Sequence, residues 1–243
     1  MRVEMLNLGW MTAPAALWRQ GDPEPGLRLR LPVPVYLIET ESERILVDTG
    51  LHPDAVVDPG NRYGESSSIG LFGLEQEETL GDQVDLSTLT KVVLTHLHFD
   101  HAGGLSLVPR SVPVIVQRAE WEAGQDRTGI ERNFFLPRDY AEAPKNLVLV
   151  DGDHDLLGDG SVQLLNTPGH TVGHQSVRVG ELVIGADVAL FADGFDDHRF
   201  PAFGYSQEQQ AESAERLRSM REEGLTVQPG HDPEVLRPGP IAT

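Results

Sequence analysis

Residues 96–101, with the sequence HLHFDH, constrain the fold of this chain more than any other segment. They follow the apolar run 92–94, which is typical of a strand buried on both faces. His96 and His98 are two residues apart, so in an extended chain both side chains point to one side. Asp100 and His101 follow in a tight turn, which the glycines at 103 and 104 allow. Four ligands in six residues do not fit around one ion, but two ions a few ångströms apart can share them. The segment therefore predicts half of a dinuclear metal site.

The available ligand types narrow the choice of metal. The chain contains no cysteine, so a metal site must use imidazole and carboxylate. Such a set suits Zn, Fe, Co or Mn. A lone histidine is more often a hydrogen-bonded core or surface residue than a ligand, but this spacing at the end of a buried strand favours metal binding.

Three further candidate ligands share one local pattern. In each case an apolar strand ends, a glycine lets the chain turn, and a ligand follows. The strands are expected at 162–165, at 182–184 and around 226–227, and the ligands that follow them are His170, Asp187 and His231.

The rest of the chain predicts a layered α/β fold in a single domain that spans residues 1–243. A helix is expected over 207–223, because Ser206 and Gln209 fit a capping box and Gly224 suits the end. Residues 13–34 are expected to be irregular, and residues 58–80 to form a long loop that covers the site. Further short strands are expected at 35–38, 45–47, 114–116, 147–150 and 176–179.

The charge balance disfavours several kinds of partner. With 19 basic and 38 acidic residues, the net charge is −19. Nucleic acids and anionic membranes both attract clustered Lys and Arg, so neither is expected as a partner. No apolar run approaches the roughly 18 residues of a membrane span. Glu4 and Asn7 interrupt the position of a signal-peptide core, so we expect a cytoplasmic protein.

The complete ligand pattern resembles that of the metallo-β-lactamase-fold superfamily. The resemblance runs from Asp48-Thr49-Gly50 to His231 and implies an αββα sandwich of two mixed sheets flanked by helices. It also implies two divalent metal ions. The resemblance assigns His96, His98 and His170 to one ion. It assigns Asp100, His101 and His231 to the other, with Asp187 as the bridge.

Within the superfamily, the chain is most similar to the quorum-quenching N-acyl homoserine lactone lactonases. The similarity is carried by residues 31–50, 96–104, 113–122 and 162–177, and above all by TPGHTVGHQS at 167–176. The common zinc β-lactamases use a cysteine ligand, which this chain lacks. One departure concerns the substrate: those lactonases typically place a Tyr three residues after the bridging Asp, where this chain has Leu190.

The resemblance implies hydrolysis of a lactone ring by a metal-bridging hydroxide, with N-acyl homoserine lactones as the leading substrates. Asp100 would also pass a proton to the leaving oxygen. Leu190 keeps a second hypothesis open, in which the same site acts on another lactone, a small ester or a phosphotriester. A third hypothesis is a non-catalytic metal-binding or sensor protein. A homodimer could form through residues 13–34 and 58–80.

Several other residues receive weaker interpretations. Asp48 either holds a ligating histidine in place or is a simple turn carboxylate. His174 is expected to make a structural hydrogen bond. The missing Tyr hydroxyl could come from Tyr63, Tyr140 or Tyr205, an acyl pocket could be lined by Trp10, Trp18 and Phe72, and surface positions are expected for His52, His154 and His198.

Overall fold

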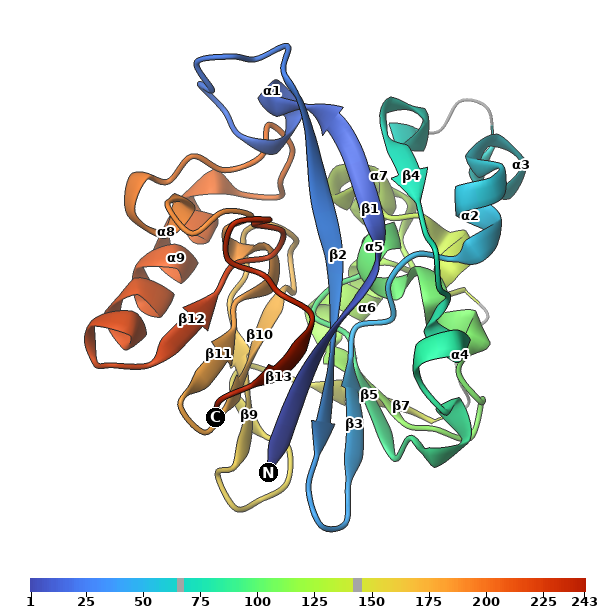
Figure 1. Cartoon of the computed structure of the whole chain (residues 1–243), viewed down its shortest axis with the longest axis vertical. Helices are drawn as coiled ribbons and strands as arrows, with labels where there is room; N and C mark the ends of the chain where they lie inside the picture. Colours follow the sequence, from blue (N-terminus) through green and yellow to red (C-terminus); the bar gives the residue numbers. More distant parts are fainter. Residues whose placement is uncertain (65–67, 142–145) are drawn as a thin grey trace.

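The computed structural model describes residues 1–64, 68–141 and 146–243. Two sheets pack face to face (Figure 1). The first has the order β13-β1-β2-β3-β5-β6-β7, with β4 paired to β1, and the second has the order β12-β11-β10-β9-β8. The strands of the first sheet are β1 (Arg2–Pro14), β2 (Arg28–Glu39), β3 (Arg44–Val47), β4 (Gly73–Glu75), β5 (Lys91–Val93), β6 (Val114–Gln117), β7 (Leu147–Val150) and β13 (Gly239–Ile241). Those of the second are β8 (His154–Asp155), β9 (Val162–Asn166), β10 (Gln175–Val179), β11 (Leu182–Ile184) and β12 (Thr226–Gln228).

Helices cover the outer face of each sheet (Figure 1). The α-helices are α1 (Ala15–Trp18), α2 (Pro53–Val57), α3 (Pro59–Tyr63), α4 (Leu80–Gln83), α5 (Phe99–Ala102), α6 (Arg118–Ala123), α7 (Arg127–Asn133), α8 (Gly194–Asp197) and α9 (Gln207–Glu222). Short 3-10 turns are η1 (Ser68–Leu71), η2 (Leu86–Thr88), η3 (Gly103–Leu107), η4 (Pro137–Asp139) and η5 (Ala186–Val188). None of the helices in the described ranges is long and apolar enough to cross a membrane.

Alternating side chains of the central strands build the layers. In β5, Val93 packs between the two sheets, whereas Val92 packs under the helices on the outer face. Both side chains are fully buried, as the continuous apolar run predicts. On the other side of the sandwich, Ala214 and Leu217 of α9 pack on the outer face of β9 and β11. The order helix, sheet, sheet, helix confirms the αββα sandwich.

The N-terminal expectation was partly wrong. Residues 19–27 are irregular, as expected, but β1 continues to Pro14, α1 follows it, and β2 begins at Arg28. Two prolines in β2 gave the misleading signal, since proline cannot donate to a neighbouring strand. Here β3 pairs only with Tyr36–Glu39, so Pro32 and Pro34 lie on a stretch of β2 that β3 does not reach.

The expected long loop over 58–80 was also partly wrong. It contains α3, η1 and β4, while residues 65–67 lie outside the described ranges. The segment nevertheless reaches the ligand-bearing edge, because Phe72 of this segment contacts the ring of Phe99 with centroids 5.7 Å apart. The helix expected over 207–223 is confirmed as α9, and Ser206 caps it by accepting a hydrogen bond from the Gln209 N–H.

Parallel pairing brings the functional segments to one edge. Strands β3, β5, β6 and β7 pair in parallel, as do β11 and β12. The carboxyl ends of parallel strands meet at the same edge, so the turns after β3 and β5 lie side by side. The Thr49 N–H donates to the His101 carbonyl at 2.7 Å, and the Gly104 N–H donates to the Gly50 carbonyl at 3.0 Å.

Replacing Gly104 by alanine should destabilise this junction. A Cβ atom there would lie 2.3 Å from the Thr49 carbonyl oxygen, closer than van der Waals contact allows. We expect Gly104→Ala to lower the free energy of unfolding by about 1–3 kcal/mol in urea titrations. Gly26→Ala is the matched control, because nothing lies within 4 Å of its added Cβ. Equal stability of the two variants would contradict this account of the junction.

Candidate metal centre

The seven predicted ligands converge at one edge of the sandwich, and all are buried. Four of them lie in the turn after β5 of the first sheet and in α5, and the other three follow strands β9, β11 and β12 of the second sheet. Their nitrogen and oxygen atoms form groups within 4.8 Å of one another, as an ion requires. The groups are His96, His98 and His170; His96, His101 and Asp187; and Asp100, His101 and His231.

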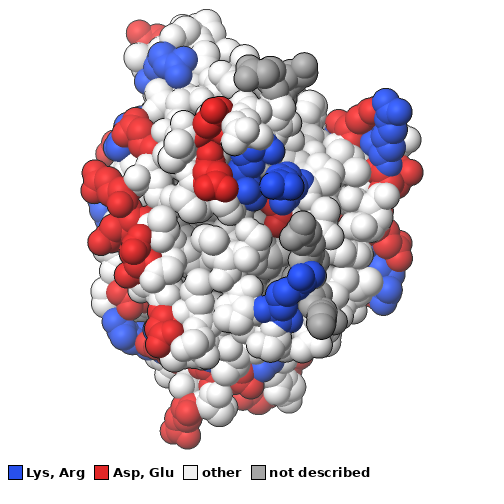
Figure 2. Space-filling model, turned by 90° about the vertical axis from the view of Figure 1, so that its right-hand side faces the viewer, with Lys and Arg blue, Asp and Glu red and all other residues white. Residues whose placement is uncertain are grey.

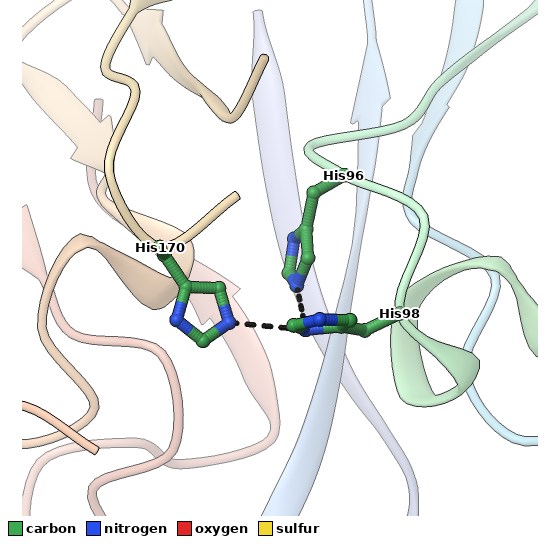
Figure 3. Close-up of side chains that lie close together, drawn as sticks. All are labelled: His96, His98 and His170. Atoms are coloured by element: carbon green, nitrogen blue, oxygen red, sulfur yellow. Dashed lines mark hydrogen bonds between the residues drawn. The ribbon is translucent and has the colours of Figure 1, made fainter. Parts of the chain in front are cut away.

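The first set consists of His96, His98 and His170 (Figure 3). The Nδ1 atom of His98 lies 3.0 Å from the Nε2 atom of His96 and 3.0 Å from the Nε2 atom of His170. His98 donates its Nε2–H to the Asn133 carbonyl at 2.8 Å, which leaves Nδ1 as the ring's lone pair. One lone pair cannot accept two N–H donors equally well, whereas three lone pairs aimed at a common point suit a cation.

The second set consists of Asp100, His101 and His231. The Oδ2 atom of Asp100 lies 3.4 Å from the Nε2 atom of each histidine. Each histidine is oriented through its other nitrogen: His101 Nδ1 donates to Asp48 Oδ2 at 2.8 Å, and His231 Nδ1 donates to the Pro32 carbonyl at 2.7 Å. Both Nε2 atoms are buried and have no hydrogen-bond partner. Buried nitrogens of this kind fit metal ligation.

Asp187 lies between the two sets. Its Oδ2 atom is 3.2 Å from His170 Nε2, on the side of the first set. Its Oδ1 atom is 3.2 Å from His231 Nε2 and 3.4 Å from His101 Nε2, on the side of the second set. Oδ1 is buried without a hydrogen-bond partner. One carboxylate thus offers one oxygen to each set.

The electrostatics of the centre favour a cation. Burial opposes the charge of Asp187, but His231, His101 and His170 outweigh it and hold the pKa of this carboxyl well below its ordinary value. Burial also opposes the charge of His101, yet Asp100, Asp187 and Asp48 raise its pKa well above the usual range. The field that favours a proton on His101 equally favours a metal ion in its place. Burial, with the charge of His170, lowers the pKa of His98 to about 3, which keeps the ring in its neutral, metal-binding form.

The supporting residues divide into expected and missed ones. Asp48 orients His101, which confirms the first of its two interpretations. His174 makes the expected structural hydrogen bond by accepting the Asp187 N–H at 3.2 Å on Nε2. Two residues were missed, Glu120 and Asn133, which hydrogen-bond the turns that carry His98 and His170. No sequence motif marks them. Glu120 lies in 113–122, one of the segments that resemble lactonases, whereas Asn133 lies outside all of these segments.

The expected surface histidines were only partly correct. His154 and His198 are exposed, but His52 is buried. His52 caps α2, because its Nδ1 accepts a hydrogen bond from the Asp54 N–H at 3.0 Å. His52 is buried because it packs closely against the turn at Gly103. A Cβ atom added at Gly103 would lie 2.8 Å from the backbone nitrogen of His52.

An apolar pocket of about 190 Å³ is lined by four of the candidate ligands, His98, Asp100, Asp187 and His231. Its walls include the expected Trp18 and Phe72, but not Trp10. The walls also include Leu190, Phe99 and Phe203. A pocket of this composition suits an acyl or alkyl group next to the metals.

None of the three candidate tyrosines is among the residues that line this pocket. The Tyr63 hydroxyl lies 3.0 Å from both carboxylate oxygens of Asp139. The Tyr140 hydroxyl donates to the Gly124 carbonyl at 3.1 Å. The ring of Tyr205 stacks under the guanidinium of Arg132. Within the described part of the chain, these tyrosines therefore do not replace the hydroxyl that Leu190 lacks.

A larger pocket of about 360 Å³ lies elsewhere and contains none of the candidate ligands. Its walls include Arg62, Arg138 and Asp139. Figure 2 shows the face that carries α2 and α3, with basic side chains near its middle and acidic side chains beside them and along both edges. Arg62 and Asp139 form a buried ion pair at 2.7 Å. The two charges neutralise each other within the wall of this pocket. The larger of the two pockets is therefore not the one that contains the candidate ligands.

Comparison with known proteins identifies the family of this chain. A model of the metallo-beta-lactamase superfamily matches residues 28–231. The N-acyl homoserine lactonase of Bacillus cereus is 35% identical over 224 residues, which cover 86% of this chain and 85% of the relative. The chain belongs to the metallo-beta-lactamase superfamily, in the N-acyl homoserine lactonase family. The more distant lactonase AttM of Rhizobium radiobacter is 28% identical over 86% of this chain and 85% of its own length.

Solved structures share the lactonase fold of this chain. One is an N-acyl homoserine lactone hydrolase with the product N-hexanoyl-L-homoserine bound at its catalytic metal centre. It is 29% identical, covers 96% of this chain and 94% of its own, and has a TM-score of 0.82. AidC, a dizinc quorum-quenching lactonase, is 16% identical with a TM-score of 0.72, covers 98% of this chain and 92% of its own, and shares the fold.

Replacing His174 should impair catalysis although it is not a candidate ligand. His174→Phe removes the acceptor of the Asp187 N–H while keeping a ring of similar size. Residues that orient metal ligands typically affect activity roughly 10- to 100-fold, and we expect a loss of kcat in that range. Steady-state kinetics with circular dichroism as a folding check measures it, and exposed His154→Phe is the control. A wild-type kcat for His174→Phe would show that this contact is dispensable.

Proposed function

We propose that the seven side chains hold two divalent metal ions, with Asp187 between them. The oriented histidine rings, the unpartnered buried Nε2 atoms and the two-sided placement of Asp187 support this assignment. The ligand chemistry favours Zn, and it also accommodates Fe, Co or Mn. One ion would take His96, His98 and His170, and the other would take Asp100, His101 and His231.

The centre is best suited to open the ring of a lactone, with N-acyl homoserine lactones as the proposed substrate class. The observation that carries this proposal is Asp187, whose carboxylate spans two ligand sets at the base of an apolar pocket. The lactone ring would lie over the ligands, and the acyl chain would pack between Trp18, Phe72 and Phe203. The family relationship to lactonases supports the same substrate class.

Asp100 and the apolar walls of the pocket have separate parts in this reaction. When bound, the divalent ions supply a water-derived nucleophile at neutral pH and polarise the ester carbonyl. Asp100 borders the pocket, and although burial opposes its charge, His101 and His231 keep its pKa below the ordinary value. As a carboxylate it can accept a proton on Oδ1, the oxygen that does not face His101 and His231, and return it to the alkoxide oxygen of the opened ring. The apolar walls exclude bulk water from the reacting ester.

A second candidate is the hydrolysis of another lactone, a small ester or a phosphotriester at the same centre. Leu190 favours it, because this side chain lines the pocket where the related lactonases typically carry a Tyr hydroxyl. A leucine cannot donate a hydrogen bond to the carbonyl or to the amide of an acyl homoserine lactone.

We further infer that residues 1–243 act as one hydrolase domain. Packing between the sheets supports this, because Val3 of β1 and Leu236 share one core cluster with the central strands. A homodimer stays a hypothesis, supported by the exposed side chains of Leu27 and Leu71 in the two segments expected to meet a partner. A cytoplasmic location likewise stays a hypothesis.

The metal assignment predicts about two metal ions per purified chain. Asp187→Ala removes the oxygen shared with each set, so we expect the metal content to fall and lactone hydrolysis to drop by at least about 1000-fold, or 4 kcal/mol in the barrier. Elemental analysis and kinetics on the same samples measure both effects. The exposed Asp159→Ala should behave as wild type. Retained activity in Asp187→Ala would count against the bridge.

A substrate series separates the two candidate functions. If acyl homoserine lactones are the substrates, kcat/KM should rise with acyl length, because each added CH₂ buries apolar surface worth about 0.8 kcal/mol. Parallel assays with aryl esters and a phosphotriester provide the comparison. No turnover of any acyl lactone, together with hydrolysis of an aryl ester or phosphotriester, would replace the leading proposal by the second.

A further inference from the structure

Glu120 is a fully buried carboxylate outside the metal centre. It lies in the first turn of α6, directly after β6. Its Oε1 atom accepts the Leu97 N–H at 2.9 Å. Its Oε2 atom accepts the Thr171 hydroxyl at 2.8 Å and the Gly173 N–H at 2.8 Å. Three donors from two distant segments therefore converge on one carboxylate.

The donors belong to the segments that carry the first ligand set. Leu97 stands between His96 and His98 in the chain, and Thr171 directly follows His170. These segments come from different sheets, and Figure 3 shows His170 approaching the other two rings from the opposite side. The two oxygens of Glu120 join the segments, one oxygen to each. Among the described residues, the hydrogen bonds of Glu120 go to Leu97, Thr171 and Gly173, and none goes to Asp100, His101 or His231.

Close packing supports the same connection. A Cβ atom at Gly173 would lie 2.3 Å from the backbone nitrogen of Glu120, so the turn after His170 rests directly on the start of α6. Asn133, at the end of α7, makes a parallel connection. Its carbonyl accepts the His98 Nε2–H at 2.8 Å, and its Oδ1 accepts the Val172 N–H at 2.9 Å.

A carboxylate at this position is expensive to bury. A neutral side chain would avoid that cost but could not accept three hydrogen bonds, two of them from main-chain N–H groups with no freedom to turn away. The charged carboxylate of Glu120 therefore fixes the distance between the segment of Leu97 and the segment of Thr171 better than a neutral side chain would.

We propose that Glu120 is a positioning residue for the first metal set. It fixes the spacing between the His96–His98 turn and His170, and so controls the affinity for the first ion without touching metal or substrate. The second set depends on Asp48 and the Pro32 carbonyl instead, so its affinity does not depend on Glu120. This inference rests on the two-ion centre of the proposed function.

Glu120→Gln tests the inference at nearly constant side-chain size. The amide nitrogen of glutamine cannot accept a hydrogen bond, so one of the two segments is released. We expect the affinity for one of the two ions to fall roughly 10- to 100-fold, with the other unchanged. Stepwise Co²⁺ titration, followed by visible absorption and checked by elemental analysis, resolves the two binding events. The loss of Co²⁺ affinity should appear in only one of the two binding events.

Two further variants provide a control and an intermediate loss of metal affinity. Glu122→Gln, on the exposed side of the same helix, should bind both ions as wild type does. Thr171→Val removes one of the three donors at constant shape and should weaken the same event by a smaller factor, which keeps the test decisive if Glu120→Gln does not fold. Unfolding of the metal-stripped proteins measures any general loss of stability separately.

The outcomes are distinguishable. Weakening of one event in Glu120→Gln and, to a smaller extent, in Thr171→Val supports the inference. Two wild-type events in both variants, or equal weakening of both events, would overturn it while leaving the two-ion centre intact. A wild-type chain that binds no Co²⁺ would overturn the proposed function and this inference together.

Discussion

The structure depends on an arrangement of buried charge that protein atoms alone do not satisfy. Asp187 presents one carboxylate oxygen to each of two ligand sets, and Nε2 of His101 and His231 faces it without a hydrogen-bond partner. In a low-dielectric environment, such groups are stable only when cations or protons lie among them. The strand ends, the glycine turns and the pocket are arranged around this requirement. Divalent ions meet it and at the same time provide the means of hydrolysis.

Around the centre, His98, His101 and His231 are each oriented by a hydrogen bond through a second ring nitrogen, and the supporting residues differ between the two sets. Asp48 adopts a left-handed backbone conformation, with φ of 63°, which aspartate tolerates better than most residues. From there its carboxylate accepts the Thr95 N–H at 2.7 Å and orients His101. The first set is held by Asn133 and Glu120 of the α6–α7 segment instead. Different supports therefore hold the two ligand sets, and the Thr95 hydroxyl links them, since it lies 2.8 Å from Asp48 Oδ2 and 3.0 Å from His96 Nδ1.

The sequence predicted the parts of this site that are local. An apolar strand, a glycine and a ligand recur at three strand ends, so the convergence of His170, Asp187 and His231 could be expected from the chain alone. What failed was non-local. The prolines at 32 and 34 suggested an irregular segment, because the sequence does not show that β3 stops short of them. Glu120 could not be found, since its partners are main-chain N–H groups and a hydroxyl of segments far away in the chain. Leu190, the departure from the lactonase pattern noted in the sequence, does line the pocket.

The division of each ligand set between the two sheets links occupancy of the site to the integrity of the fold. An ion held by His96 and His98 from one sheet and by His170 from the other favours the docked sandwich over any state in which the sheets have separated. By mass action, the free energy that it adds grows with RT ln(1 + [M]/Kd), where [M] is the free metal concentration. Apparent stability is thus a property of the protein together with its metal supply. Metal starvation would therefore shorten the lifetime of the folded chain as well as silence its chemistry.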